Sequence, residues 1–218
     1  MQSRKINRLF QKLSDAIPEP VTELIHHNHF ELLIAVILSA QATDKSVNKV
    51  TPELFARYPE PHDFLEAGEE TVLAGIKTIG LAKTKSANII KTCQMLVEIH
   101  GGHVPETREE LEKLAGVGRK TANVILNTAF GVPVIAVDTH VFRVSNRTGL
   151  TEGKNPVQVE KQLMEAIPEK WKKDAHHFLV LHGRYVCKAK VPLCGQCPIV
   201  KECEFPEKVK EGEKKTKR

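Results

Sequence analysis

A lysine at the predicted start of a helix is well suited to covalent chemistry. Lys120 follows Gly116 and Gly118, and the two glycines predict a hairpin too tight for side chains after a short helix over 107–114. The first amides of the next helix then lack partners and suit a phosphate. Such turns also occur commonly with a purely structural role, so the segment by itself favours nucleic-acid binding only modestly.

The helix after this hairpin has one apolar face. Its apolar residues follow the spacing of an amphipathic helix: Ala122, Ile125, Leu126, Ala129 and Phe130. This spacing places Lys120, Asn123 and Asn127 on the opposite face. We therefore expect the lysine to point away from the core.

A second lysine has nearly the same neighbours. The six residues from Lys85 match the six from Lys120 in type at every position, and both sets follow a turn that contains glycine. Duplication and coincidence both explain one match of this length. The local sequence therefore leaves two candidate nucleophiles.

Asp138 is a candidate partner for a lysine nucleophile. It follows the apolar run 134–137 and precedes a helical pattern, which is typical of an N-cap. A carboxylate at a helix start is held in place and kept ionised by the amides, so capping and chemistry are compatible. Helix-start amides, Arg119 and burial all disfavour the ammonium of Lys120. The free amine can form a Schiff base with a sugar carbon.

Four of the five cysteines lie within one short segment. Cys187, Cys194, Cys197 and Cys203 are separated by six, two and five residues. Nothing marks the chain as secreted, which disfavours disulfides, so the cluster indicates a metal site. A zinc ion and an iron–sulfur cluster both accept four thiolates, and the spacing leaves the choice open. The fifth, Cys93, lies in an apolar helical pattern and is expected to be a buried thiol.

Composition predicts an all-α protein. The 218 residues include only 5% aromatics, and the prolines leave long segments between them that suit helices. The apolar run 32–38 is too short for a membrane span and predicts a buried helix. Near the start of the chain, a helical stripe of apolar residues is expected to pack against the rest of the protein: Ile6, Leu9, Phe10, Leu13 and Ile17. The net charge of +5 is compatible with a polyanionic partner, and a cytoplasmic location is expected.

In combination, these motifs resemble the endonuclease III family of bifunctional DNA glycosylases and AP lyases. The resemblance runs from about residue 5 to 205 in a single order. It includes the hairpin 114–122, the Val-Asp-Thr-His segment at 137–140 and the cysteine segment, together with 38–44 and 182–184.

The resemblance implies two helical domains with DNA bound in the cleft between them. A six-helix domain would cover 22–132. The other domain would join 1–21 to 133–205 and carry a [4Fe-4S] cluster on the four cysteines, while the basic tail 206–218 is expected to be disordered. We expect a monomer without membrane contact, associated with the nucleoid if the source is prokaryotic.

Each site residue acquires an implied role from the family. Lys120 becomes the nucleophile and Asp138 its carboxylate partner, while Lys85 becomes a surface or phosphate-facing residue. The remaining positions would contact DNA: Gln41, Leu81 and His140 fill or wedge the duplex, and Gly116, Gly118, Arg119, Lys188 and Lys190 grip phosphates.

The implied function is base excision repair of duplex DNA that carries oxidised pyrimidines or abasic sites. The enzyme would remove the base and cut the strand on the 3′ side by β-elimination. One alternative is a monofunctional glycosylase for adenine or a mismatch. Such enzymes use a carboxylate where this chain has Ala35 and carry a C-terminal domain, whereas only 15 residues follow Cys203. Another is a non-catalytic helix-hairpin-helix module with structural zinc.

Overall fold

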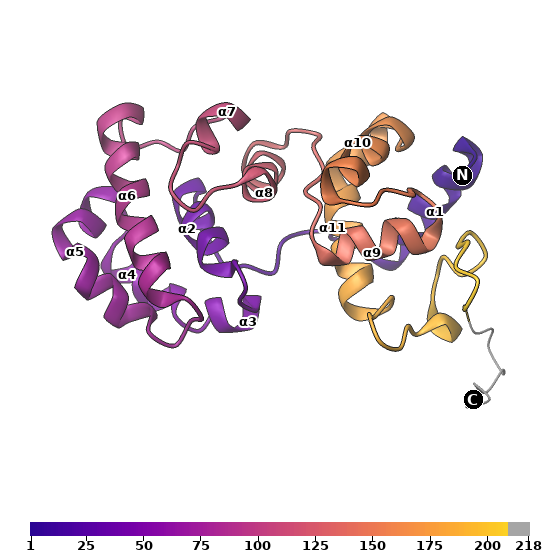
Figure 1. Ribbon diagram of the computed structural model, residues 1–218, viewed down its shortest axis with the longest axis horizontal. Helices are drawn as coiled ribbons and strands as arrows, with labels where there is room; N and C mark the ends of the chain where they lie inside the picture. Colours follow the sequence, from indigo (N-terminus) through magenta and orange to yellow (C-terminus); the bar gives the residue numbers. More distant parts are fainter. Residues whose placement is uncertain (209–218) are drawn as a thin grey trace. The chain divides into compact units, whose positions relative to one another are not determined.

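The computed structural model describes residues 1–208 (Figure 1). Every regular element in that range is a helix, so the all-α prediction is confirmed. No helix in this part of the chain combines the length and the apolar character needed to cross a membrane. Of the tail expected over 206–218, residues 209–218 lie outside the described range.

The chain divides into two compact units. One unit runs from Thr22 to Gly131, and the other joins Met1–Val21 to the chain from Val132 onward. The first unit holds α2 (His29–Ser39), α3 (Asp44–Val47), α4 (Thr51–Arg57), α5 (Pro61–Ile76), α6 (Ala82–His100), α7 (Arg108–Leu111) and α8 (Arg119–Phe130). The second holds α1 (Ser3–Ala16), α9 (Thr139–Thr148), α10 (Pro156–Ala166), α11 (Glu169–Tyr185) and the short 3-10 helix η1 (Cys194–Gln196).

The Thr22–Gly131 unit is built around α2. Every residue from 30 to 38 is buried, as the apolar run predicts, and α2 packs against both α6 and α8. The prediction of a polar face on α8 is wrong at two positions, because Asn123 and Asn127 are buried. Both asparagines have interaction partners.

In the second unit, the N-terminal helix completes a core formed mainly by residues after 132. The predicted stripe on α1 is confirmed: Ile6, Leu9, Phe10 and Leu13 are buried in one cluster with α9, α10 and α11, and Ile17 packs against that cluster. The ring of Phe10 lies 6.2 Å from that of Trp171 and 6.4 Å from that of Phe178. The unit is therefore discontinuous in sequence but has a single core.

The two similar lysines occupy different environments. Leu81 and Gly116 both have left-handed backbones, with φ of 62° and 79°, so the turns before the two lysines share this feature. However, α6 begins at Ala82 and α8 at Arg119. Lys85 is consequently the fourth residue of its helix and Lys120 the second. Lys120 is exposed, whereas Lys85 is only 3% exposed, so the expected surface position of Lys85 is wrong.

The buried ammonium of Lys85 has no hydrogen-bond partner, and burial lowers the pKa of Lys85 below its ordinary value of 10.5. Between the lowered pKa and 10.5 the unfolded chain binds more protons than the folded one, so stability rises with pH through that interval. We expect Lys85→Met to raise the free energy of unfolding at neutral pH and to abolish that rise. Urea titrations from neutral pH to pH 10.5 measure both effects.

The matched control is Lys83→Met, since Lys83 lies in the same helical turn but is exposed. This variant should leave the pH dependence unchanged. A loss of stability in Lys85→Met at neutral pH would contradict the interpretation of Lys85 as an unpaired buried cation.

Candidate active site and cysteine loop

The hairpin before α8 is packed against α6 with no room for a side chain on its first glycine. A Cβ on Gly116 would lie 2.8 Å from the Nδ2 atom of Asn88, and its φ of 79° already favours glycine. One turn further along α6, the Thr92 hydroxyl donates a 2.9 Å hydrogen bond to the Ala115 carbonyl. The helix thus fixes the turn from one side.

Gly118 has a different role from Gly116. Its φ of −99° is ordinary, and a Cβ there would meet nothing within 4 Å. The absence of a side chain therefore leaves open space in front of α8. Gly118 is also the N-cap of α8 and offers no side-chain cap, so the start of α8 is well suited to accept an anion. Arg119 and Lys120 lie exposed at this same end.

Gln41 and Leu81 share an uncommon backbone conformation. They are the two non-glycine residues with positive φ in the described chain, at 54° and 62°. Gln41 lies beyond the end of α2 rather than in the helix. A Cβ on Gly80, next to Leu81, would be 3.8 Å from the Gln41 carbonyl oxygen, so the two turns are adjacent. Both side chains are exposed, and strained, exposed residues of this kind cluster at functional sites.

Asp138 is the N-cap of α9, as its position in the sequence predicts. Its Oδ1 accepts a 2.7 Å hydrogen bond from the Val141 amide. The carboxylate is half-buried, and its Oδ2 accepts no hydrogen bond from a described residue. One oxygen therefore holds the residue in place while the other is available. Asp138 and Lys120 belong to different units.

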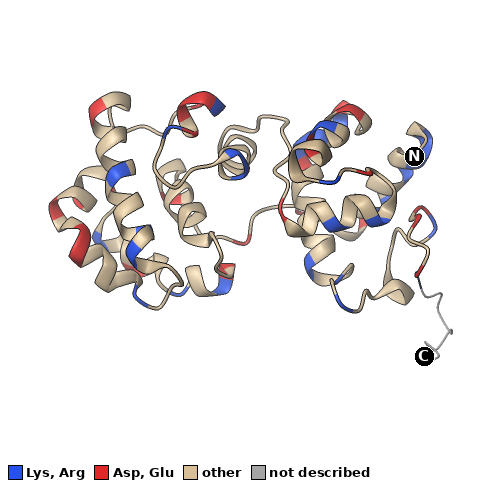
Figure 2. Ribbon diagram, viewed as in Figure 1, with Lys and Arg blue, Asp and Glu red and all other residues tan. Residues whose placement is uncertain are grey.

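The arginines on α9 were not identified from the sequence. Arg143 donates hydrogen bonds to the carbonyls of Cys187 and Gly183, at 3.0 and 2.8 Å, and contacts Nδ1 of His140 at 3.1 Å. A guanidinium only donates, so Nδ1 of His140 is the acceptor and its Nε2 carries the proton. Two arginines four residues apart after the predicted N-cap were the available signal, and Figure 2 shows the basic residues along α9.

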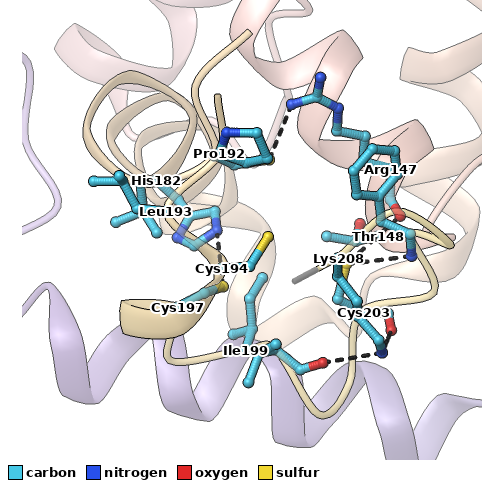
Figure 3. Close-up of a pocket in the computed structure, with 14 residues that line it drawn as sticks. Arg147, Thr148, His182, Pro192, Leu193, Cys194, Cys197, Ile199, Cys203 and Lys208 are labelled. Carbon is cyan, nitrogen blue, oxygen red and sulfur yellow. Dashed lines mark hydrogen bonds between the residues drawn. The ribbon is translucent and has the colours of Figure 1, made fainter. Parts of the chain in front are cut away.

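The four clustered cysteines line one pocket, shown in Figure 3. Burial, together with smaller contributions from the three other thiols nearby, raises the pKa of Cys197 to about 12. Burial also raises the pKa of Cys203. Thiolates crowded into a buried site need a positive group among them to stay ionised, and a metal centre meets that need. Cys93, in α6, is a buried thiol as expected, and its pKa is also raised to about 12.

Several donors from the protein face the sulfurs. The Phe205 amide lies 3.4 Å from the sulfur of Cys203, Arg147 lies 3.7 Å from that of Cys187, and Nε2 of His182 lies 3.7 Å from that of Cys197. Burial lowers the pKa of His182 to about 4, so its imidazole is neutral. His182 was noted in the sequence only as part of the resemblance.

The pocket is not arranged for a single ion. Within residues 1–208, no group of three or more His, Cys, Asp or Glu side chains is placed to hold one metal ion. The four cysteines thus line one pocket, but their side chains are not placed to hold a single metal ion.

Lys188 and Lys190 lie exposed on the loop between the first two cysteines. Arg147 holds this loop by donating 2.8 Å hydrogen bonds to the carbonyls of Lys188 and Ala189. The backbone is therefore fixed while the lysine side chains are directed to solvent. The exposed Val191 between them and the pocket adds no charge.

Comparisons with known proteins agree with the motifs. A family model described as HhH-GPD superfamily base excision DNA repair protein matches residues 34–169. Endonuclease III of Haemophilus influenzae is 56% identical over 209 residues, which is 96% of this chain and 99% of the relative. Endonuclease III of Bacillus subtilis is 47% identical over 99% of this chain and 96% of its own length.

A solved structure of a trapped endonuclease III–DNA covalent intermediate is 47% identical to this chain. It superposes with a TM-score of 0.88 and covers 94% of this chain and 96% of that one. Identity of this level over nearly the whole length confirms the resemblance based on the motifs, and the chain belongs to the endonuclease III family within the HhH-GPD superfamily of base excision DNA repair proteins.

Proposed function

We propose that Lys120 is the nucleophile and Asp138 its carboxylate partner in this base excision repair DNA glycosylase and AP lyase. The observation that carries the choice of lysine is exposure: Lys120 lies open at an uncapped helix start, whereas its counterpart Lys85 is buried. The relative solved as a trapped covalent intermediate with DNA supports chemistry through a covalent bond. The substrates we propose are oxidised pyrimidines and abasic sites in duplex DNA.

The reaction begins when the damaged nucleotide is flipped out of the duplex, because its glycosidic bond is not reachable inside the stack. The free oxygen of Asp138 accepts a proton from the Lys120 ammonium. The neutral amine then attacks C1′ of the deoxyribose, and the base departs with the electrons of the glycosidic bond. Asp138 passes the proton it accepted to the departing base, and the carboxylate, ionised again, offsets the positive charge on the sugar.

Strand cleavage follows from the bond that Lys120 has formed. Opening of the sugar ring gives a protonated Schiff base between Lys120 and C1′. This cation acidifies the C2′ protons, and the loss of one of them expels the 3′ phosphate by β-elimination. Hydrolysis of the remaining imine releases Lys120.

DNA contacts are proposed on both units. The start of α8, with Gly116, Gly118 and Arg119, would bind a phosphate through its amides and charge. Gln41, Leu81 and His140 would occupy the space that the flipped base leaves. Lys188 and Lys190 would add phosphate contacts, so binding should weaken as salt rises.

We propose that the four cysteines hold a [4Fe-4S] cluster. A mononuclear zinc ion requires four sulfurs about 2.3 Å from one point, and the pocket is not arranged in that way. A four-iron cluster would be held by the thiolates of Cys187, Cys194, Cys197 and Cys203, the all-sulfur donor set that such clusters use. When bound, the cluster would compensate the thiolate charges and cross-link the segment 187–203.

Borohydride trapping tests the nucleophile. The native protein should form a covalent adduct with thymine-glycol or abasic DNA on reduction, and Lys120→Ala should abolish it, because only a primary amine gives a reducible Schiff base. Lys91→Ala, which removes an exposed lysine elsewhere in the same unit, should trap normally. Undiminished trapping by Lys120→Ala would refute the assignment. No trapping by the native protein would favour a monofunctional enzyme or a DNA-binding module.

Two substitutions at Asp138 separate its charge from its cap. Asparagine caps helices about as well as aspartate but carries no charge, so Asp138→Asn should keep stability while slowing base removal by on the order of 10²- to 10⁴-fold. Asp138→Ala should show the same kinetic loss plus a destabilisation of about 1 kcal/mol from the lost cap. Single-turnover rates, DNA affinity and thermal unfolding measure the three quantities. Equal losses of rate and DNA affinity in Asp138→Asn would favour the cap as the only role.

Metal analysis tests the cluster. The purified protein should absorb visible light and contain about four irons per chain, as expected for a four-thiolate cluster, and Cys197→Ser should lose most of both. Cys93→Ala is the matched control, because Cys93 is a buried thiol in the other unit, and it should retain the iron. A colourless native protein with one zinc per chain would overturn the assignment.

A further inference from the structure

The segment that carries Asp138 has no regular secondary structure. Residues 131–138 lie between α8 and α9 without helix or strand, yet Ile135, Ala136 and Val137 are buried. The segment also contains the boundary between the two units, after Gly131. Outside a helix or sheet, its buried backbone groups need partners from elsewhere, since an unpaired buried carbonyl is costly.

A buried histidine provides one of these partners. The Nδ1 atom of His176 lies 2.9 Å from the carbonyl oxygen of Ala136, and His176 is 5% exposed. A carbonyl only accepts, so Nδ1 carries the proton and donates. His176 belongs to α11, which is packed against α1 and α9 in the core of its unit. The hydrogen bond therefore ties the segment to a rigid helix.

The anchored carbonyl lies close to the proposed catalytic carboxylate along the chain. Asp138 is the second residue after Ala136, so their Cα atoms are at most about 7 Å apart. Asp138 is fixed on its other side by the cap bond to Val141. His176 and the Val141 amide thus hold the segment before and at Asp138.

We infer that His176 is a positioning residue for Asp138. His176 anchors the segment 131–138 to α11, so that the Asp138 carboxylate is held in a fixed position within its own unit. Lys120 belongs to the other unit. This inference rests on the proposed role of Asp138. Positioning matters here because a displacement of a reacting group by about 1 Å can lower the reaction rate on the order of 10²-fold.

The test compares two substitutions at His176. His176→Asn keeps an N–H donor near the position of Nδ1, whereas His176→Leu removes the donor and keeps similar bulk. We expect His176→Leu to slow single-turnover base excision by about 10- to 100-fold, in line with a misplaced reacting group, with DNA affinity little changed. His176→Asn should recover most of the rate. The matched control is His177→Leu. The His177 ring is also buried, and its centroid lies 5.0 Å from that of the His176 ring. In the described chain, His177 makes no hydrogen bond to the segment 131–138.

A double-mutant cycle shows whether His176 acts through Asp138. If it does, His176→Leu should add little to the loss already present in Asp138→Asn, because coupled residues are not additive. Iron content and thermal unfolding of each variant confirm that the unit is folded. The inference is overturned if His176→Leu retains the full rate, if His177→Leu is equally slow, or if the losses of His176→Leu and Asp138→Asn add fully.

These outcomes are distinct from a failure of the proposed function. If native protein gives no borohydride adduct, or if Asp138→Asn is fully active, the proposed chemistry itself is wrong. If native protein does form the adduct and Asp138→Asn is slow, but the losses in the double-mutant cycle are additive, the proposed chemistry stands and His176 is an ordinary packing residue.

Discussion

The contact between α6 and the glycine hairpin is the constraint on which the rest of the proposed site depends. With Gly116 pressed against Asn88 and Ala115 hydrogen-bonded to Thr92, the turn has one position relative to the helix behind it. That position decides where α8 starts. Because α8 starts at Arg119, Lys120 is exposed in the first turn of the helix, next to backbone amides that no N-cap side chain occupies. A single larger residue at 116 would displace all of these features together.

Much of this arrangement is predictable from local patterns, and the failures have physical causes. The helix period identified α8 and the stripe on α1, and the N-cap rule placed Asp138 at the start of α9. Asn123 and Asn127 were misplaced because a helix enclosed on several sides buries polar residues that have partners, which an apolar-stripe argument ignores. Lys85 was misplaced because the two turns start their helices at different points. A shift of two residues rotates a side chain by about half a turn around the helix.

Other features depend on tertiary structure, and the local sequence gave only an incomplete signal for them. The spacing of the cysteines indicated a metal without saying which one, because the decisive quantity is the distance between sulfurs in the folded loop. The arginines of α9 were not singled out in the sequence. In the structure Arg143 and Arg147 hold carbonyls of the segment that contains Cys187. These hydrogen bonds tie the loop, which has no regular secondary structure at these residues, to α9.

The backbones of Gln41 and Leu81 have a consequence for how this protein can change over time. A left-handed conformation at a leucine costs on the order of 1–2 kcal/mol that glycine would not incur, and Leu81 is also exposed, so burial gives little in return. Replacement of Leu81 by a residue tolerant of this conformation would therefore make the free protein more stable. Stability at this turn favours glycine, whereas the role proposed for Leu81 in filling the duplex requires a bulky side chain, so the two requirements act in opposite directions. A leucine at a position where stability alone favours glycine therefore supports the proposed contact of this side chain with DNA.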